Sequence, residues 1–374
     1  MVTAAHPHPA RSAVTRRPGR VRTVRHLGPN WYATVMGTAI VATAGAGLPV
    51  HVPGLRTALT AVWALALVAL VALLAARAVH WTHHRDQARA DLQDPAAAPF
   101  YGCLSMALLA VGGGALVVGR DWIGTPAAVA LDAVLFTAGT LTGLAAAVCV
   151  PYLLVVRRRT APAQVTPVWL LPVVAPMVSA ALGPPLVPHL PAGQPRATLL
   201  LACVAMFGLS LLATLVMLPL VFGRLATGDP LPQVLTPTLF LVLGPLGQST
   251  TAVDRFAVTA PGVLPAPFDR GFDVLAVLYG VPVMGFALLW LALASALVVR
   301  ARRRGMGFAM TWWALTFPVG TCVTGAEGLA RHTGLVAYEV LSVCLYALLL
   351  TAWGVAAVRT ARGLLDGGLL AAPR

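Results

Sequence analysis

Charged residues are scarce in this 374-residue chain, and lysine does not occur in it at all. Only 10% of the residues are charged, whereas 58% are hydrophobic. A soluble domain carries roughly 25% charged residues, because its surface has to stay in water. The scarcity of charge therefore excludes an ordinary soluble protein, and it predicts an all-α integral membrane protein with lipid as its solvent.

Motifs typical of enzymes and metal proteins are missing as well. The five cysteines lie in apolar stretches and form no C-x-x-C pair, so neither a disulfide framework nor a zinc site is predicted. The apolar stretches hold no paired carboxylates and no nucleophile beside a base, and a phosphate-binding loop would need the absent lysine. The histidines between His80 and His84 are expected in a solvated cytoplasmic loop. We therefore expect no enzymatic activity, no cofactor and no metal.

Ten apolar segments are each long enough, at about 20 residues, to cross the hydrocarbon core as a helix. Very short connections alternate with longer ones that carry arginine, which favours an arrangement as five helical hairpins. The ten predicted spans are residues 31–50, 57–79, 100–118, 127–156, 167–187, 196–222, 235–256, 271–299, 307–330 and 335–358.

The arginines predict how the spans are oriented. With the N-terminus inside, 20 of the 26 arginines fall on the cytoplasmic side, as the positive-inside rule requires of a cell-membrane protein. Because they lie in short runs between apolar stretches, the formal charge of +14 does not indicate a nucleic-acid partner. We expect a disordered basic cytoplasmic tail (1–28), a transmembrane domain (29–360) and a short cytoplasmic C-terminal tail (361–374).

The odd-numbered spans resemble one another. Each opens with a large aromatic residue, and these aromatics are 69 to 72 residues apart: Trp31, Phe100, Trp169, Phe240 and Trp312. Each span also carries glycine or proline about two turns further in, including Gly37, Pro176, Pro245 and Pro318. Such residues are tolerated in a membrane where protein or a water-filled cavity satisfies the freed backbone groups. The pattern predicts five inner helices around a pore and five outer helices facing lipid, although glycine and proline are common in membrane helices generally.

Two of these spans contain sequence motifs that resemble those of a known family. The stretch Gly28–Thr38 (GPNWYATVMGT) is similar to the first-span motif of the tellurite-resistance/dicarboxylate transporter family, and Trp312–Pro318 (WWALTFP) is similar to its ninth-span motif. The family includes bacterial tellurite-resistance proteins, fungal malate and sulfite transporters, and plant slow anion channels. The resemblance implies ten transmembrane helices as five hairpins with quasi-five-fold symmetry around a central pore, and often a homotrimer.

Phe317 is the predicted gate of that pore. In the family a phenylalanine midway along the ninth helix plugs the pore, and Phe317 matches that position. An aromatic ring beside a proline-weakened helix can keep water out of a narrow channel, which is how hydrophobic gates work. The alternative is an ordinary packing or lipid-facing phenylalanine.

Polar residues of the odd spans are candidates for the pore lining. Serine and threonine in membrane helices also bond to their own backbone or to neighbouring helices, so the pattern alone does not separate these roles. The dense cluster Gln248–Thr251 is expected to face the pore in part. The candidates are Thr34, Thr38, Ser105, Ser179, Gln248, Ser249, Thr251, Thr316, Thr321 and Thr324.

Basic residues mark the outer end of every odd span: His51, Arg120, His189, Arg255 and Arg331. They predict an external vestibule whose positive potential concentrates anions. Cations also favour helix C-termini, where the helix dipole is negative, and both explanations stay open.

Four carboxylates lie toward the outer ends of the spans. We expect Asp254 to pair with the adjacent Arg255, and Glu327 to pair with Arg331 four residues further on. Asp132 and Glu339 have no obvious partner in the sequence, which makes them candidates for proton coupling.

The predicted function is transport of a small anion or organic acid through a Phe-gated central pore. Candidate substrates are a C4-dicarboxylate such as malate, sulfite or a related oxyanion. The alternative is a non-conducting membrane sensor or scaffold, which the short loops and tails do not favour. Neither the motifs nor the composition selects one anion.

Overall fold

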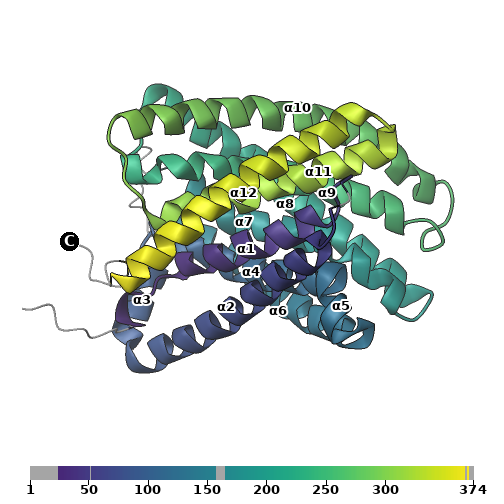
Figure 1. Cartoon of the computed structure of the whole chain (residues 1–374), viewed down its shortest axis with the longest axis horizontal. Helices are drawn as coiled ribbons and strands as arrows, with labels where there is room; N and C mark the ends of the chain where they lie inside the picture. The colour runs from purple at the N-terminus through teal and green to yellow at the C-terminus, as the bar shows by residue number, and fades with distance from the viewer. Residues whose placement is uncertain (1–23, 51, 157–164, 367–368, 370–374) are drawn as a thin grey trace, which may run out of the picture.

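The computed structural model describes residues 24–50, 52–156, 165–366 and 369, and throughout this part of the chain the regular elements are helices (Figure 1). Most of the predicted basic tail, His51, the arginine run 157–159 and the end of the C-terminal tail lie outside the described residues.

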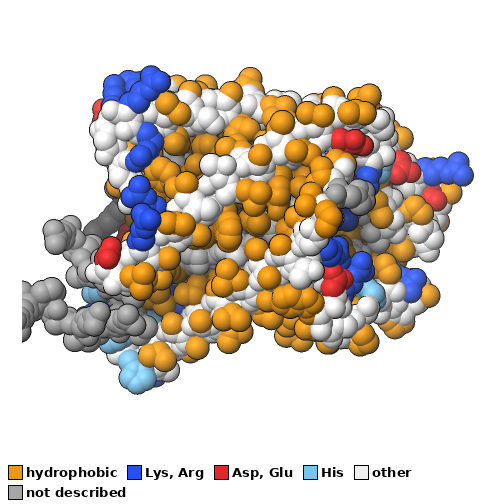
Figure 2. All heavy atoms as spheres, viewed as in Figure 1, with side chains coloured by type: hydrophobic (Ala, Val, Ile, Leu, Met, Phe, Trp, Pro, Cys, Tyr) orange, Lys and Arg blue, Asp and Glu red, His pale blue; other side chains and the backbone are white. Residues whose placement is uncertain are grey.

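Five long helices form the outside of the bundle. They expose many large apolar side chains, such as Val68, Leu212 and Leu278, which are 66%, 66% and 71% exposed. The apolar side chains cover the middle of the bundle in Figure 2, and such a surface is stable against lipid. The outer helices are α2 (Leu55–His83), α6 (Thr125–Val156), α8 (Gln194–Thr227), α10 (Phe268–Arg303) and α12 (Val336–Leu365).

Five shorter helices fill the interior: α1 (Tyr32–Gly45), α4 (Tyr101–Gly114), α7 (Leu170–Leu182), α9 (Leu243–Thr259) and α11 (Phe317–Thr333). Nearly all of their residues are buried. Each inner helix contacts the next, and α11 contacts α1, so the five form a closed ring. Each also packs against the outer helix that follows it in the chain.

The repeated aromatics lie where the inner helices begin. Each falls in a 3-10 segment that leads into an inner helix, namely Pro29–Trp31, Ala98–Phe100, Pro167–Trp169, Gln233–Val242 (η8) and Met310–Leu315 (η9). A 3-10 helix rises about 2.0 Å per residue against 1.5 Å in an α-helix, so these segments extend the reach of short helices.

Of the ten predicted spans, six are helices long and apolar enough to cross a bilayer: the five outer helices and the continuous segment Ala98–Ile123. The inner helices α1, α7, α9 and α11 have only 13 to 17 residues. The apolar stretches predicted there include the 3-10 segments, which is why the sequence makes these helices look longer.

The glycines and prolines predicted as kinks play different structural parts. Pro318 is the second residue of α11, where the missing N–H leaves no helical bond unmade, so it starts that helix instead of bending it. Pro245 is the third residue of α9, close to the point where η8 passes directly into α9. Pro176 lies inside α7 and Gly37 inside α1, and both helices continue through these residues. Gly37 packs against the Thr316 hydroxyl, so its small size brings α1 close to α11.

The histidine segment expected as a loop is helical. α2 continues through His83, and the His80 side chain is completely buried. A short helix, α3 (Arg85–Gln93), folds back so that Asp91 lies 3.8 Å from both His80 and Arg77. Arg77 also donates to the Tyr101 hydroxyl at 3.0 Å, which ties α2 to α4 at the end where α10 and α12 finish in arginine-rich turns.

Candidate functional site

The ring of inner helices encloses two small cavities. The first, which we call the polar cavity, has a volume of about 40 Å³, and its polar lining comes from Thr43, Gln248, Thr251, Arg255 and Thr324. The second, the apolar cavity, has a volume of about 10 Å³ and is nearer the starts of the inner helices. Its lining residues are Met36, Met106, Leu170, Leu171, Val174, Leu241, Gly244, Phe317 and Pro318.

Phe317 lines both cavities. It is the first residue of α11 and is 2% exposed, so it begins the helix instead of lying midway along it. A cavity needs about 10–15 Å³ to hold one water molecule, which the apolar cavity barely reaches. The residues that line the apolar cavity offer no polar side chain to bind that water.

Three side chains that line the apolar cavity together with Phe317 come from nearly the same position in their repeated units. Counted from the repeated aromatics, Met36, Val174 and Phe317 are all at position +5, and Met106 is at +6. We call these four residues the collar. Sequence reasoning singled out Phe317 and missed the other three, although comparing position +5 between the repeats would have found Met36 and Val174.

Most of the predicted pore-lining hydroxyls bond elsewhere. Thr38 accepts a hydrogen bond from Trp353 of α12 at 3.1 Å, and Ser105 donates to the Gly139 carbonyl of α6 at 2.6 Å. Ser249 lines a pocket at the contact with α10. Thr34 and Thr316 donate to carbonyls three residues earlier in their own segments. Hydroxyls in apolar helices find such partners because an unpaired one is costly there.

Gln248 does line the polar cavity, together with hydroxyls on either side of it. Thr251 of α9 and Thr324 of α11 are 2.7 Å apart at their Oγ1 atoms, so they join the two helices as well as lining the cavity. Thr43 of α1 was missed in the sequence, because no neighbouring polar residue draws attention to it. The Thr251 and Thr324 hydroxyls donate to carbonyls of their own helices, so the donors that this lining offers an anion are the Gln248 amide and the Arg255 guanidinium.

An ionic cluster lies beyond the polar cavity. Asp254 is 2% exposed and accepts a hydrogen bond from Arg331 at 2.7 Å, with His332 at 3.3 Å and Arg255 at 3.8 Å. The predicted pair between Glu327 and Arg331 is therefore replaced by a pair between α9 and α11. The reason is the close approach of these helices: a Cβ at Gly328 would lie 2.8 Å from the Asp254 Cβ.

The predicted vestibule residues do not share one environment. Arg255 lines the polar cavity and is 34% exposed, whereas Arg331 is engaged by Asp254. Arg120 and His189 are exposed at the bundle surface, and His51 lies outside the described residues. Fixed positive charge at the polar cavity therefore comes from Arg255, where surrounding low-dielectric walls strengthen its field.

The two candidates for proton coupling also differ. Asp132 of α6 is 1% exposed and packs on Gly112 of α4, where a Cβ would lie 2.5 Å from its Oδ1. Within the described residues neither of its carboxylate oxygens has a hydrogen-bond partner. Glu339 is exposed in the first turn of α12, a favourable place for a negative charge.

Comparison with known proteins gives consistent matches along the chain. Residues 26–361 match the family described as voltage-dependent anion channel. The sulfite efflux pump of Arthroderma otae is 26% identical over 340 residues, which is 88% of each chain. The sulfite efflux pump of Trichophyton rubrum is 26% identical over 85% of each chain. An uncharacterized transporter of Methanocaldococcus jannaschii is 24% identical over 92% of this chain and 95% of its own.

Proposed function

We propose that this chain, which belongs to the voltage-dependent anion channel family, conducts small oxyanions through the centre of its inner ring. We also propose that Phe317 closes this path. The chain is a multi-pass membrane anion transporter, as the family and the apolar helices indicate. One observation supports the gate: Phe317 lies between a polar cavity and an apolar cavity that barely has room for a single water.

The architecture we propose is the one that the repeat predicts. Ten helices, paired as five hairpins with quasi-five-fold symmetry, would place the polar cavity and its arginine on the outer side. Both termini would then lie in the cytoplasm of the cell membrane, with the arginine-rich ends of α10 and α12 facing it. The proposed assembly is a homotrimer, in which each subunit would carry its own pore.

Sulfite or a similarly small oxyanion is the proposed substrate, ahead of malate. Curated relatives of this chain are sulfite efflux pumps. The polar cavity of about 40 Å³ is also small for a C4-dicarboxylate with two charged ends. One cationic side chain beside the Gln248 amide suits a compact anion, because the cavity offers charge and hydrogen-bond donors without a second fixed cation.

The direct test is anion flux in proteoliposomes that contain the purified chain. Sulfite, nitrate, chloride and malate are compared at equal concentrations, with protein-free liposomes as the baseline. Flux that is faster for sulfite and nitrate than for malate supports the proposal. If every anion stays at the baseline, also after alanine replaces Phe317, the chain is better described as a non-conducting sensor or scaffold.

Neutralising Arg255 is expected to slow anion entry. In the Arg255→Gln variant, flux at low salt should fall about 3- to 10-fold, and the difference should shrink at high salt as the field is screened. The fold should survive, since Asp254 keeps Arg331 and His332 beside it. Arg120→Gln is the matched control, because it removes the same charge from the exposed surface. Equal effects of the two variants would contradict a special role for Arg255.

We propose Asp132, and not the exposed Glu339, as the site of proton coupling. An unpaired carboxylate between α4 and α6 changes its hydration and packing when it gains or loses a proton. We expect an inward proton gradient to accelerate nitrate flux in the wild type and to have no effect on Asp132→Asn. Nitrate is used because its own charge does not change over the pH range. A gradient response that is lost in Glu339→Gln, or kept in Asp132→Asn, would reject the assignment.

A further inference from the structure

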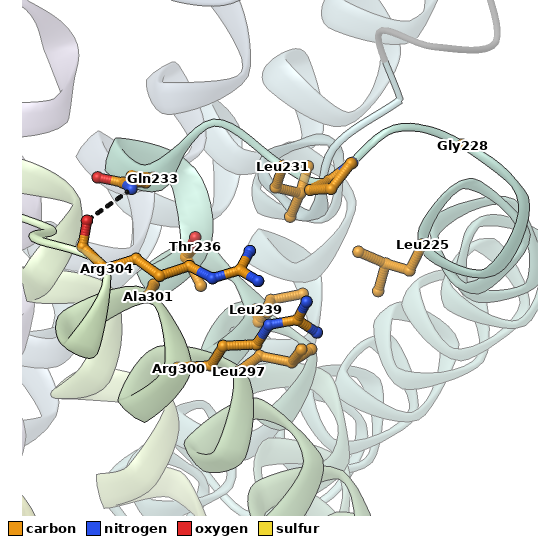
Figure 3. A pocket seen from close by; sticks show the side chains of 11 residues that line it. Leu225, Gly228, Leu231, Gln233, Thr236, Leu239, Leu297, Arg300, Ala301 and Arg304 are labelled. Atoms are coloured by element: carbon orange, nitrogen blue, oxygen red, sulfur yellow. Dashed lines mark hydrogen bonds between the residues drawn. The ribbon is translucent and has the colours of Figure 1, made fainter.

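A larger cavity lies at the arginine-rich end of the bundle, away from the ring axis. It has a volume of about 370 Å³, at the lower end of the roughly 300–1,000 Å³ range of small-molecule sites. Its walls are the C-terminal turns of α8 and α10, the connection after α8, and the segment η8 (Figure 3).

Two arginines supply the charge of this cavity, Arg300 in the last turn of α10 and Arg304 directly after that helix. Arg300 and Arg304 are one helical turn apart, so they share a face of the chain, and both guanidinium groups extend into the cavity (Figure 3). Gln233 holds the turn after α10 by donating to the Arg304 carbonyl at 3.2 Å. Among the described residues that line the cavity there is no carboxylate, so two like charges share its lining.

The opposite wall is apolar. Leu225 and Leu231 face the two guanidinium groups across the cavity, and Leu239 and Leu297 lie at its base (Figure 3). The neighbouring outer surface is also apolar, with Phe222 53% exposed and Val299 49% exposed. The cavity thus offers positive charge beside a surface that continues into the lipid-facing side of the bundle.

We propose that this cavity binds the phosphate headgroup of an anionic phospholipid. Arg300 and Arg304 bind the phosphate oxygens, which relieves the repulsion between the two guanidinium groups. The acyl chains follow the apolar surface between α8 and α10. A free phosphate ion could satisfy the arginines, but it would leave the leucine wall unused. Basic pockets between membrane helices near the interface are suited to such headgroups.

The site is also placed to influence the pore. Thr236 and Leu239 belong to η8, which runs directly into α9, and Leu241 and Gly244 further along line the apolar cavity beside Phe317. Trp290 of α10 donates to the Leu239 carbonyl at 2.9 Å, so the headgroup site and η8 are held by the same helix. A bound lipid therefore contacts the segment that positions one side of the collar region.

Native mass spectrometry of the purified chain tests the proposal without measuring transport. Phosphatidylglycerol, phosphatidylcholine with the same acyl chains, and inorganic phosphate are titrated separately. We expect phosphatidylglycerol to bind more tightly than the other two, and its affinity to fall about tenfold or more in Arg300→Gln/Arg304→Gln. Arg359→Gln/Arg362→Gln removes the same charge from exposed positions of α12 and should change the affinity less than about twofold.

A second variant tests the cavity without altering charge. Leu231→Trp fills the space opposite the arginines, and it should weaken phosphatidylglycerol binding while both arginines remain. Equal loss in the Arg300/Arg304 and Arg359/Arg362 variants would show general surface attraction and overturn the site. Phosphate binding as tight as that of phosphatidylglycerol would overturn the lipid as its ligand. These outcomes hold whether or not the chain conducts, so a failure here is separate from a failure of the proposed transport.

Discussion

Replacing Phe317 with alanine should raise anion flux by about tenfold or more, because the proposed gate, which would keep water out of the path, is removed. In the structure the ring of Phe317 lines both the polar and the apolar cavity. Deletion of the ring joins these spaces, and the inner helices collapse only partly into the void because their backbones pack closely. Water and a hydrated anion can then cross the collar.

The measurement is sulfite and nitrate efflux from proteoliposomes with matched protein content. Phe222→Ala is the control, since it removes the same side chain from a lipid-facing position of α8 that is 53% exposed. Its flux should equal that of the wild type. Met106→Ala, which shortens a collar residue from α4, should give a smaller gain. Unchanged flux in a folded Phe317→Ala protein would show that the path is closed elsewhere.

Replacing Gly247 with alanine should lower the unfolding temperature by about 1–4 °C, because overpacking of a close helix contact typically costs about 1–3 kcal/mol. A Cβ at Gly247 would lie 2.5 Å from both the Cys322 nitrogen and the Thr321 carbonyl carbon. These are backbone atoms of α11, so no side-chain rotation can relieve the clash. The two inner helices must separate, and the Thr251–Thr324 contact at the polar cavity must lengthen.

Thermal unfolding in detergent measures this effect. Gly285→Ala is the matched control, since a Cβ at that position of α10 meets nothing within 4 Å. Its unfolding temperature should stay the same or rise slightly, because alanine favours a helix more than glycine does. Flux of Gly247→Ala should fall together with its stability. Equal stabilities of the two variants would mean that α9 and α11 are less tightly packed than the structure indicates.

Much of the architecture follows from the sequence because it depends on local properties of the chain. Long apolar segments require lipid on the outside, and the nearly equal spacing of Trp31, Phe100, Trp169, Phe240 and Trp312 indicates repeated units. The two family motifs, confirmed by the match over residues 26–361, led to anion transport and to Phe317 as a gate candidate. These inferences need only residue type and spacing.

The tertiary structure alone decided which side chains share a space. Inner helices are buried on every side, so their periodicity does not tell which face meets the axis. Several hydroxyls proposed for the pore bond to other helices or to their own backbone. Arg331 paired with Asp254 of α9 instead of Glu327 of its own helix, because glycines let the two backbones approach. The lipid-headgroup cavity likewise combines α8, η8 and α10. Contacts between distant segments depend on helix packing, which the order of residues along one helix does not encode.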